Sequence, residues 1–93
     1  MGREDYNSLV ARSESVGTAL MCARVASNLS IEVLAERTKV STRFLHALER
    51  DDFSVFVSRI YIMGFAKAYA KVVGLDCEGI VSSLRHQLSP EPL

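Results

Sequence analysis

The sequence is poor in the residues that mark unusual chains: it has no tryptophan, two prolines and five glycines among 93 residues, and no low-complexity run. This composition excludes collagen-like, mucin-like and wholly disordered chains. The chain also lacks a net charge, because eleven basic residues balance eleven acidic ones. The total charge therefore gives no reason to expect nucleic acid or an anionic membrane as a partner. The apolar content of 48% is enough for one small core, and the length leaves no room for two.

Long hydrophobic runs are also missing. The first 15 residues are polar and lack the apolar stretch of a signal peptide. The most apolar region, residues 58–75, is interrupted by Arg59, Lys67 and Lys71, whereas a membrane-spanning helix needs about 20 mostly apolar residues. We therefore expect a cytoplasmic chain with no membrane segment.

Recognisable catalytic and metal-binding patterns are absent as well. Cys22 and Cys77 show neither CxxC nor CxxH spacing, so we expect two free, buried thiols and no zinc site. His46, His86 and the carboxylates form no nucleophile-base-orienter grouping, and there is no glycine-rich phosphate loop. We therefore expect no enzyme activity, no metal and no cofactor.

What the sequence does contain is a series of helix-capping residues, each followed by apolar positions spaced three and four apart. This pattern predicts five short helices and no strand. The expected helices are 15–27, 31–38, 42–50, 58–73 and 77–88, with caps at Ser15, Ser30, Ser41, Ser58 and Asp76 and a glycine stop at Gly74. The second and third helices are joined by a short turn, which is the pattern of a helix-turn-helix.

We therefore predict an all-α, compact five-helix bundle containing a repressor-like helix-turn-helix. The domain spans residues 15–88, between a polar N-terminal arm (1–14) and a C-terminal tail (89–93). The first helix is expected to bury a narrow face of small residues, and the loop at 51–57 is expected to contribute apolar side chains to the core. These residues are Val16, Ala19, Leu20, Ala23 and Ala26 in the helix, and Phe53, Val55 and Phe56 in the loop.

The third helix divides into two faces when its residues are placed at about 100° steps. Phe44, Leu45 and Leu48 share one arc, which would anchor the helix in the core. The opposite arc carries a hydroxyl, an imidazole and two guanidiniums, which suit base edges and phosphates. The helix N-termini at Ser30 and Ser41 are favourable phosphate sites. The candidate DNA contacts are Ser30, Lys39, Ser41, Thr42, Arg43, His46, Arg50 and Arg59.

The alternative interpretation is that this arc is the ordinary solvated face of an amphipathic helix. Glu49, Asp51 and Asp52 lie close by in the sequence and would weaken a positive field there.

The fourth helix carries two further patterns. Arg59, Lys67 and Lys71 form a basic stripe on an otherwise apolar helix, which is either central to the core or meets a partner. Its aromatics share one face at i, i+4 and i+8 and are either a contact strip or core: Tyr61, Phe65 and Tyr69. The apolar stripe of the fifth helix either closes the core or builds a homodimer: Ile80, Leu84 and Leu88.

Two segments carry a resemblance to a known family. They are LSIEVLAERTKVSTRFLHALERDDF, with its LAERTKV run and Leu-Glu-x-x-Asp-Phe ending, and IYIMGFAKAYAKVVGLD, with its tyrosine, glycine-aromatic and Tyr-Ala elements before Gly-Leu-Asp. Through them, residues 15–88 resemble the N-terminal helix-turn-helix domain of RodZ-type proteins, a branch of the Cro and phage-repressor-like superfamily. The resemblance implies a compact five-helix domain.

The resemblance implies two different functions. In membrane-anchored RodZ-type proteins the domain binds the actin-like protein MreB through fourth-helix aromatics, which correspond here to Tyr61 and Phe65. In the repressor-like superfamily the third helix reads DNA. The positions that reach bases and phosphates there correspond here to Thr42, Arg43, His46 and Arg50, with Ser30 and Ser41 near the backbone. This chain departs from both patterns. Ile31 replaces a common phosphate-binding glutamine, and the segment 56–59 (FVSR) replaces a Leu-Pro-Gly-Pro-like turn.

The leading hypothesis is a sequence-specific DNA-binding transcriptional regulator, with its third helix in the major groove and with Arg59 and the fourth-helix lysines on the phosphate backbone. Fold-level analogy extends this to control of a phage-derived or gene-transfer-agent-like cluster, with partners in the transcription machinery. Residues 15–75 hold eight basic and five acidic residues, so the proposed DNA-binding segment is only modestly basic. Binding by one subunit should therefore be weak and salt-sensitive, which favours a homodimer. The alternative is a RodZ-like module that binds MreB in cell-shape control.

Overall fold

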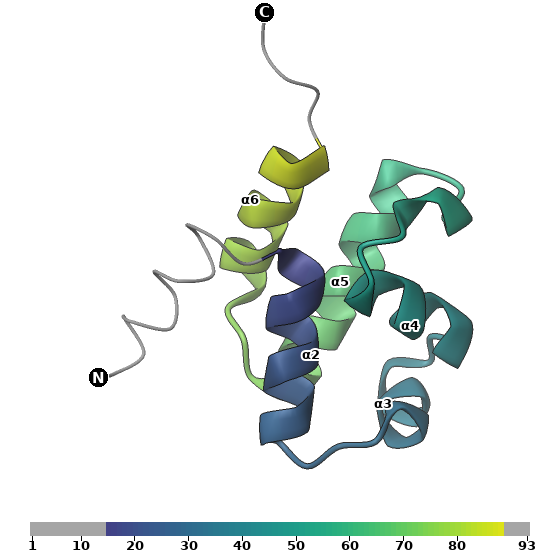
Figure 1. The fold of residues 1–93 in the computed structure, drawn as a ribbon, viewed down its shortest axis with the longest axis vertical. Helices are drawn as coiled ribbons and strands as arrows, with labels where there is room; N and C mark the ends of the chain where they lie inside the picture. Colours follow the sequence, from purple (N-terminus) through teal and green to yellow (C-terminus); the bar gives the residue numbers. More distant parts are fainter. Residues whose placement is uncertain (1–14, 89–93) are drawn as a thin grey trace, which may run out of the picture.

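The computed structural model describes residues 15–88, which form five α-helices and one short 3-10 helix (Figure 1). The elements are α2 (Val16–Ala26), α3 (Ile31–Thr38), α4 (Thr42–Glu49), η1 (Phe53–Val55), α5 (Arg59–Val73) and α6 (Cys77–Leu88). This part of the chain contains no strand, so the predicted all-α bundle is confirmed, and each α-helix agrees with its predicted bounds to within one residue. The predicted arm (1–14) and tail (89–93) lie outside the described residues.

The helices begin and end where the sequence places capping residues. Ser15 and Ser30 each accept a hydrogen bond from the backbone N–H three residues later, at 3.1 Å. Ser41 takes the N-cap position of α4 with an extended backbone, but its side chain makes no capping bond. Gly74 ends α5 in the left-handed conformation at φ 82°, and Lys39 ends α3 in the same conformation at φ 62°.

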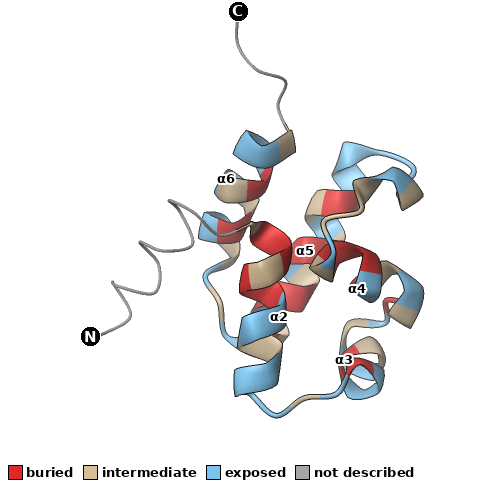
Figure 2. Ribbon diagram, viewed as in Figure 1, coloured by how far each residue is buried: buried red, intermediate tan, exposed pale blue. Residues whose placement is uncertain are grey.

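The core is built around α5, against which α2, α3, α4 and α6 all pack (Figures 1 and 2). One face of α5 is buried along its length, and the loop aromatic Phe56 is buried beside it, as predicted. Phe53 and Val55 pack against this core from η1. The largest fully buried side chains are Val16, Leu20, Leu34, Leu45, Leu48, Tyr69 and Leu84.

Two predictions about burial are wrong. Ala26 is exposed, because the last turns of α2 extend beyond the core on their way to α3 (Figure 2). Cys22 is also exposed, because it lies on the side of α2 away from Leu20, and Cys77 is only partly buried at the start of α6. Both thiols are free.

No single helix among residues 15–88 has the length and apolar character to cross a membrane. The helices α2 and α3 are long and apolar enough for a membrane span only when they are counted as one segment, and their axes are bent by 104° at the break between them.

A polar cluster inside the domain connects α2, α4 and α5. The guanidinium of Arg24 donates to the carboxylate of Glu49 through Nε at 2.7 Å and Nη2 at 3.3 Å, and through Nη1 to the Leu29 carbonyl at 2.9 Å. The hydroxyl of Tyr69 donates to the same carboxylate. Burial, together with this carboxylate, raises the pKa of Tyr69, and the hydrogen bond to Glu49 raises the pKa of Arg24. The carboxylate of Glu49 therefore links α4 to Arg24 of α2 and to Tyr69 of α5 inside the domain.

A second polar cluster attaches the end of α4 to the start of α2. Asp51, which adopts φ 58°, accepts hydrogen bonds from the Ser15 hydroxyl at 2.6 Å, the Gly17 N–H at 3.0 Å and the Gln87 amide at 2.9 Å. The side-chain oxygen Oε1 of Gln87 in turn accepts a hydrogen bond from the N–H of Val16 at 3.0 Å. Asp51 thus caps α2, because its carboxylate binds a backbone N–H group in the first turn of that helix.

Candidate nucleic-acid interface

The outer face of α4 carries the side chains expected to read DNA. Arg43, His46 and Arg50 are exposed, and Thr42 is partly exposed at the first position of the helix. On the inner side Leu45 and Leu48 are fully buried. The predicted division of this helix into a core face and a polar face is therefore observed, and packing against the core fixes which face points outward.

Two of the three acidic residues near α4 are engaged by other helices. Glu49 is 6% exposed and paired with Arg24, and the carboxylate of Asp51 caps α2. Asp52 is partly buried and accepts a hydrogen bond from the Ser54 hydroxyl at 2.7 Å. The sequence alone indicated that these acids would weaken a positive field on α4. The structure turns Glu49 and Asp51 toward other helices, so the outer face of α4 presents mainly cations.

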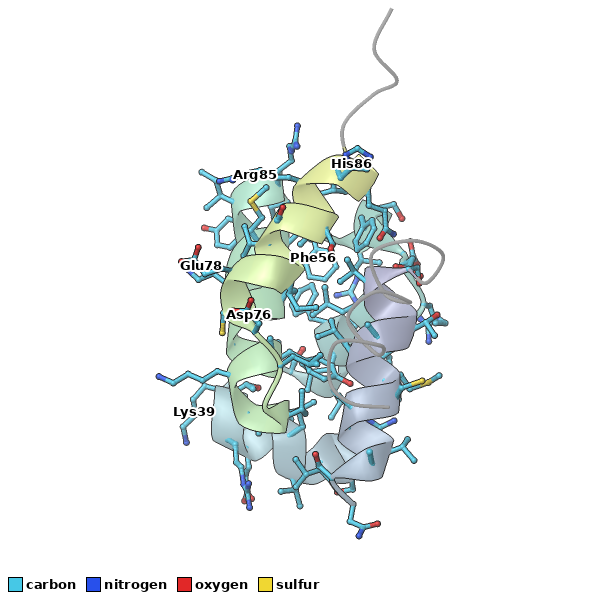
Figure 3. All side chains as sticks on the ribbon, turned by 90° about the vertical axis from the view of Figure 1, so that its left-hand side faces the viewer. Lys39, Phe56, Asp76, Glu78, Arg85 and His86 are labelled. Carbon is cyan, nitrogen blue, oxygen red and sulfur yellow. The ribbon has the colours of Figure 1, made fainter. Side chains whose placement is uncertain are left out.

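The flanking candidates lie at the N-termini of α3, α4 and α5 and in the turn between α3 and α4. Ser30 and Ser41 are exposed at the N-termini of α3 and α4, although the Ser30 hydroxyl already accepts the capping bond of its own helix. Lys39 is exposed in the turn between α3 and α4, and Arg59 is exposed at the first position of α5. In Figure 3, Lys39 lies at the end of the molecule opposite to Arg85 and His86 of α6. The arrangement offers hydroxyls, helix N-termini and cations for phosphates beside a helix that carries guanidiniums for bases.

An aromatic cluster beneath Arg43 was not predicted from the sequence. The ring of Phe44 lies 5.3 Å from that of Phe56 and 5.5 Å from that of Phe65, centroid to centroid. The guanidinium carbon of Arg43 lies 5.5 Å from the centroid of Phe44. Such a cation–π contact supports the arginine on a rigid surface and leaves its donor edge available.

The aromatic residues of α5 do not form one exposed strip. Tyr61 is 52% exposed, while Phe65 is partly buried in the aromatic cluster. The prediction that Tyr69 can contact a partner is wrong, because its ring is fully buried and its hydroxyl binds Glu49. Val57 and Ile60, which the sequence analysis did not single out, are instead 88% and 79% exposed beside Tyr61.

The fourth-helix lysines lie apart from the α4 surface. Lys67 lines a hollow between α5 and α6, and Lys71 is exposed one turn further along the same face of α5. The structure therefore does not place these two cations with Arg43 and Arg50. Within residues 15–88, no group of three or more His, Cys, Asp or Glu side chains is arranged to hold a metal ion.

Comparison with known proteins agrees with this architecture. A family of helix-turn-helix domains matches residues 19–80. The cytoskeleton protein RodZ of Streptococcus pneumoniae is 37% identical over 65 residues, which are 70% of this chain and 24% of that protein. The uncharacterised membrane protein YmfM of Bacillus subtilis is 36% identical over 50 residues, which are 54% of this chain and 17% of that protein.

This chain thus spans about a quarter or less of the length of these two relatives. No solved structure gives a significant match. The family match covers about two thirds of the chain and includes α3, α4 and α5 in full, so the chain belongs to the RodZ-type family of helix-turn-helix domains.

Proposed function

We propose that this domain binds double-stranded DNA as a cytoplasmic, non-enzymatic transcriptional regulator, with α4 in the major groove. The observation that carries the proposal is the outer face of α4, where Arg43, His46 and Arg50 are exposed while Glu49 and Asp51 are engaged elsewhere. An arginine in the first turn of such a helix can bind guanine through two parallel hydrogen bonds. Ser41, Lys39 and Arg59 are exposed, and we propose that they contact the phosphate backbone.

The modest charge of the domain predicts how it binds. Residues 15–75 carry a small excess of basic residues, so one subunit makes few phosphate contacts and binds weakly. We propose that a homodimer on two half-sites about one helical turn apart, assisted by partner proteins, provides useful affinity.

Replacing Arg43 with alanine is expected to weaken binding to the specific site by about 1–3 kcal/mol and to relax discrimination at one base pair. The measurement is a titration of duplex DNA by fluorescence anisotropy at several salt concentrations. Arg43→Lys should keep the salt dependence and lose base discrimination, because lysine retains the charge without the two-pronged donor geometry. Arg85→Ala on α6 is the matched control and should bind as the wild type does. Binding that is insensitive both to salt and to the loss of Arg43 would rule out this interface.

A second function is favoured by a separate observation. Val57, just before α5, and Ile60 and Tyr61, in its first turn, are all exposed, and the ring of Tyr61 packs on Phe65 of the aromatic cluster. Exposed apolar groups of this kind are typical of protein-binding sites, and one relative is a cytoskeleton protein. The alternative function is therefore a protein-interaction module that binds the actin-like protein MreB.

The alternative predicts that the chain co-sediments with MreB filaments and that Tyr61→Ala reduces this binding by about tenfold or more, as expected for an aromatic anchor. Tyr61 is the residue to change because it is exposed, whereas Phe65 supports the aromatic cluster and its loss would also destabilise the fold. Val25→Ala, which removes an exposed apolar side chain from α2, serves as the control. Absence of the wild-type chain from the filament pellet would exclude this function.

A further inference from the structure

The ring beneath Arg43 is held in place by the core of the domain. Phe44 packs against Phe56 and Phe65, and the rings of Phe56 and Phe65 in turn lie 5.8 Å apart, centroid to centroid. Phe56 is buried, and Phe44 and Phe65 are partly buried. Each ring of the aromatic cluster therefore contacts the other two, so the ring of Phe44 cannot move aside without disturbing the packing around it.

The contact with this ring also sets the direction of the Arg43 side chain. Residues 43 and 44 lie about 100° apart around α4, and neighbouring side chains on a helix do not ordinarily face each other. The guanidinium carbon of Arg43 is nonetheless 5.5 Å from the centroid of Phe44. The side chain therefore extends sideways over a fixed ring.

This confinement separates Arg43 from the other exposed arginines of the candidate interface. Within residues 15–88, the structure gives neither Arg50 nor Arg59 a ring contact of this kind. A long exposed side chain loses rotational freedom when it binds, and this loss opposes binding. Arg43 has already lost part of that freedom in the free domain, so its guanidinium is the one best prepared for a contact that depends on orientation.

We propose that Phe44 is a positioning residue for DNA reading, whose ring holds the guanidinium of Arg43 in the orientation that selects a guanine. The inference rests on the proposed DNA-binding function and adds to it a residue that acts through Arg43. Two N–H donors of a guanidinium must meet O6 and N7 of guanine at the same time. A loss of orientation should therefore lower base discrimination, whereas attraction to phosphates depends on the charge, which is unchanged.

The test compares Phe44→Leu, Phe44→Tyr and the wild type on a duplex that the full chain selects from a random pool. Phe44→Leu is expected to lower the preference for the base pair read by Arg43 by about two- to fivefold, which corresponds to a cation–π contact at an exposed site. The salt dependence of binding should stay the same, because every cation remains. Phe44→Tyr keeps the aromatic ring and should keep the preference. Ile80→Val, which shortens a buried side chain of α6, controls for a general loss of stability.

A double-mutant cycle separates positioning from a purely structural role. If Phe44 acts through Arg43, Phe44→Leu should have no further effect on base preference in an Arg43→Ala chain. A second measurement needs no DNA. The ¹⁵N relaxation of the Arg43 Nε–H group in the free chain should show larger motion in Phe44→Leu than in the wild type, while that of Arg59 is unchanged.

The outcomes distinguish this inference from the proposed function. If Arg43→Ala loses base preference and Phe44→Leu keeps it, the positioning role is wrong and DNA reading by α4 stands. Equal effects of Phe44→Leu with and without Arg43, or of Phe44→Leu and Ile80→Val, also overturn the positioning role, because Phe44 would then act on the fold alone. Tighter specific binding by Phe44→Leu overturns it as well, since the ring would then withhold the guanidinium. A wild-type chain that selects no duplex overturns the proposed function and this inference together.

Discussion

Replacing Gly17 with alanine is expected to lower the free energy of unfolding by about 3 kcal/mol or more, or to prevent folding. A Cβ at this position would lie 2.5 Å from the carbonyl oxygen of Leu48 and 2.6 Å from that of Glu49. Both obstacles are backbone atoms at the end of α4, so they cannot move aside as a flexible side chain would. Any shift that relieves the clash also separates the Gly17 N–H from Asp51, which it binds at 3.0 Å.

The matched control is the same substitution at Gly64. Nothing lies within 4 Å of an added Cβ there, so Gly64→Ala should raise the free energy of unfolding by up to about 1 kcal/mol through helix propensity alone. Urea denaturation followed by circular dichroism measures both variants. A Gly17→Ala chain with the stability of the wild type would show that α2 and α4 are not in this close contact.

Replacing Glu49 with alanine is expected to cost about 3–5 kcal/mol, because removing one partner of a buried ion pair leaves the other charge uncompensated. The guanidinium of Arg24 is 16% exposed and loses both bonds to the carboxylate, and the Tyr69 hydroxyl loses its acceptor. Glu36→Ala is the matched control, because it truncates a glutamate that is exposed on the surface of α3. This control should change the free energy of unfolding by less than about 0.5 kcal/mol. Equal stability of the two variants in urea would contradict the structural role of Glu49.

The same cluster predicts a loss of stability in alkali. Burial raises the pKa of Tyr69 in the folded state, whereas an unfolded tyrosine ionises near pH 10. Above about pH 10 the unfolded state releases this proton and the folded state retains it, so the free energy of unfolding falls as the pH rises. Tyr69→Phe should cost about 1–2 kcal/mol at neutral pH and should show a smaller alkaline decline. A decline of the same size in both chains would exclude Tyr69 as its source.

The helices were predictable because their boundaries are local. Ser15 and Ser30 cap through bonds to backbone groups three residues away, and Gly74 ends α5 through its own backbone conformation. The two faces of α4 follow from the spacing of Leu45 and Leu48 for the same reason. Each of these features depends on residues within one or two turns, which a sequence pattern contains.

The features that decide the character of the site are long-range and were not predictable. Arg24 and Glu49 are 25 residues apart, and Ser15 and Asp51 are 36 apart, so nothing local shows that both acids turn away from the surface of α4. Tyr69 belongs to the same helical face as Tyr61 by spacing, yet Tyr69 is fully buried with its hydroxyl bound to Glu49 of α4, whereas Tyr61 is half-exposed in the first turn of α5.

DNA reading by α4 is tested most directly by genome-wide occupancy of the tagged protein, compared between the wild type and Arg43→Ala. Arg43 is exposed and its guanidinium lies over the ring of Phe44 on the surface, so the variant should fold as the wild type does. Discrete occupied sites that share a sequence and disappear in Arg43→Ala are the expected result. Occupancy that is uniform along the genome, or identical in the two strains, would contradict it.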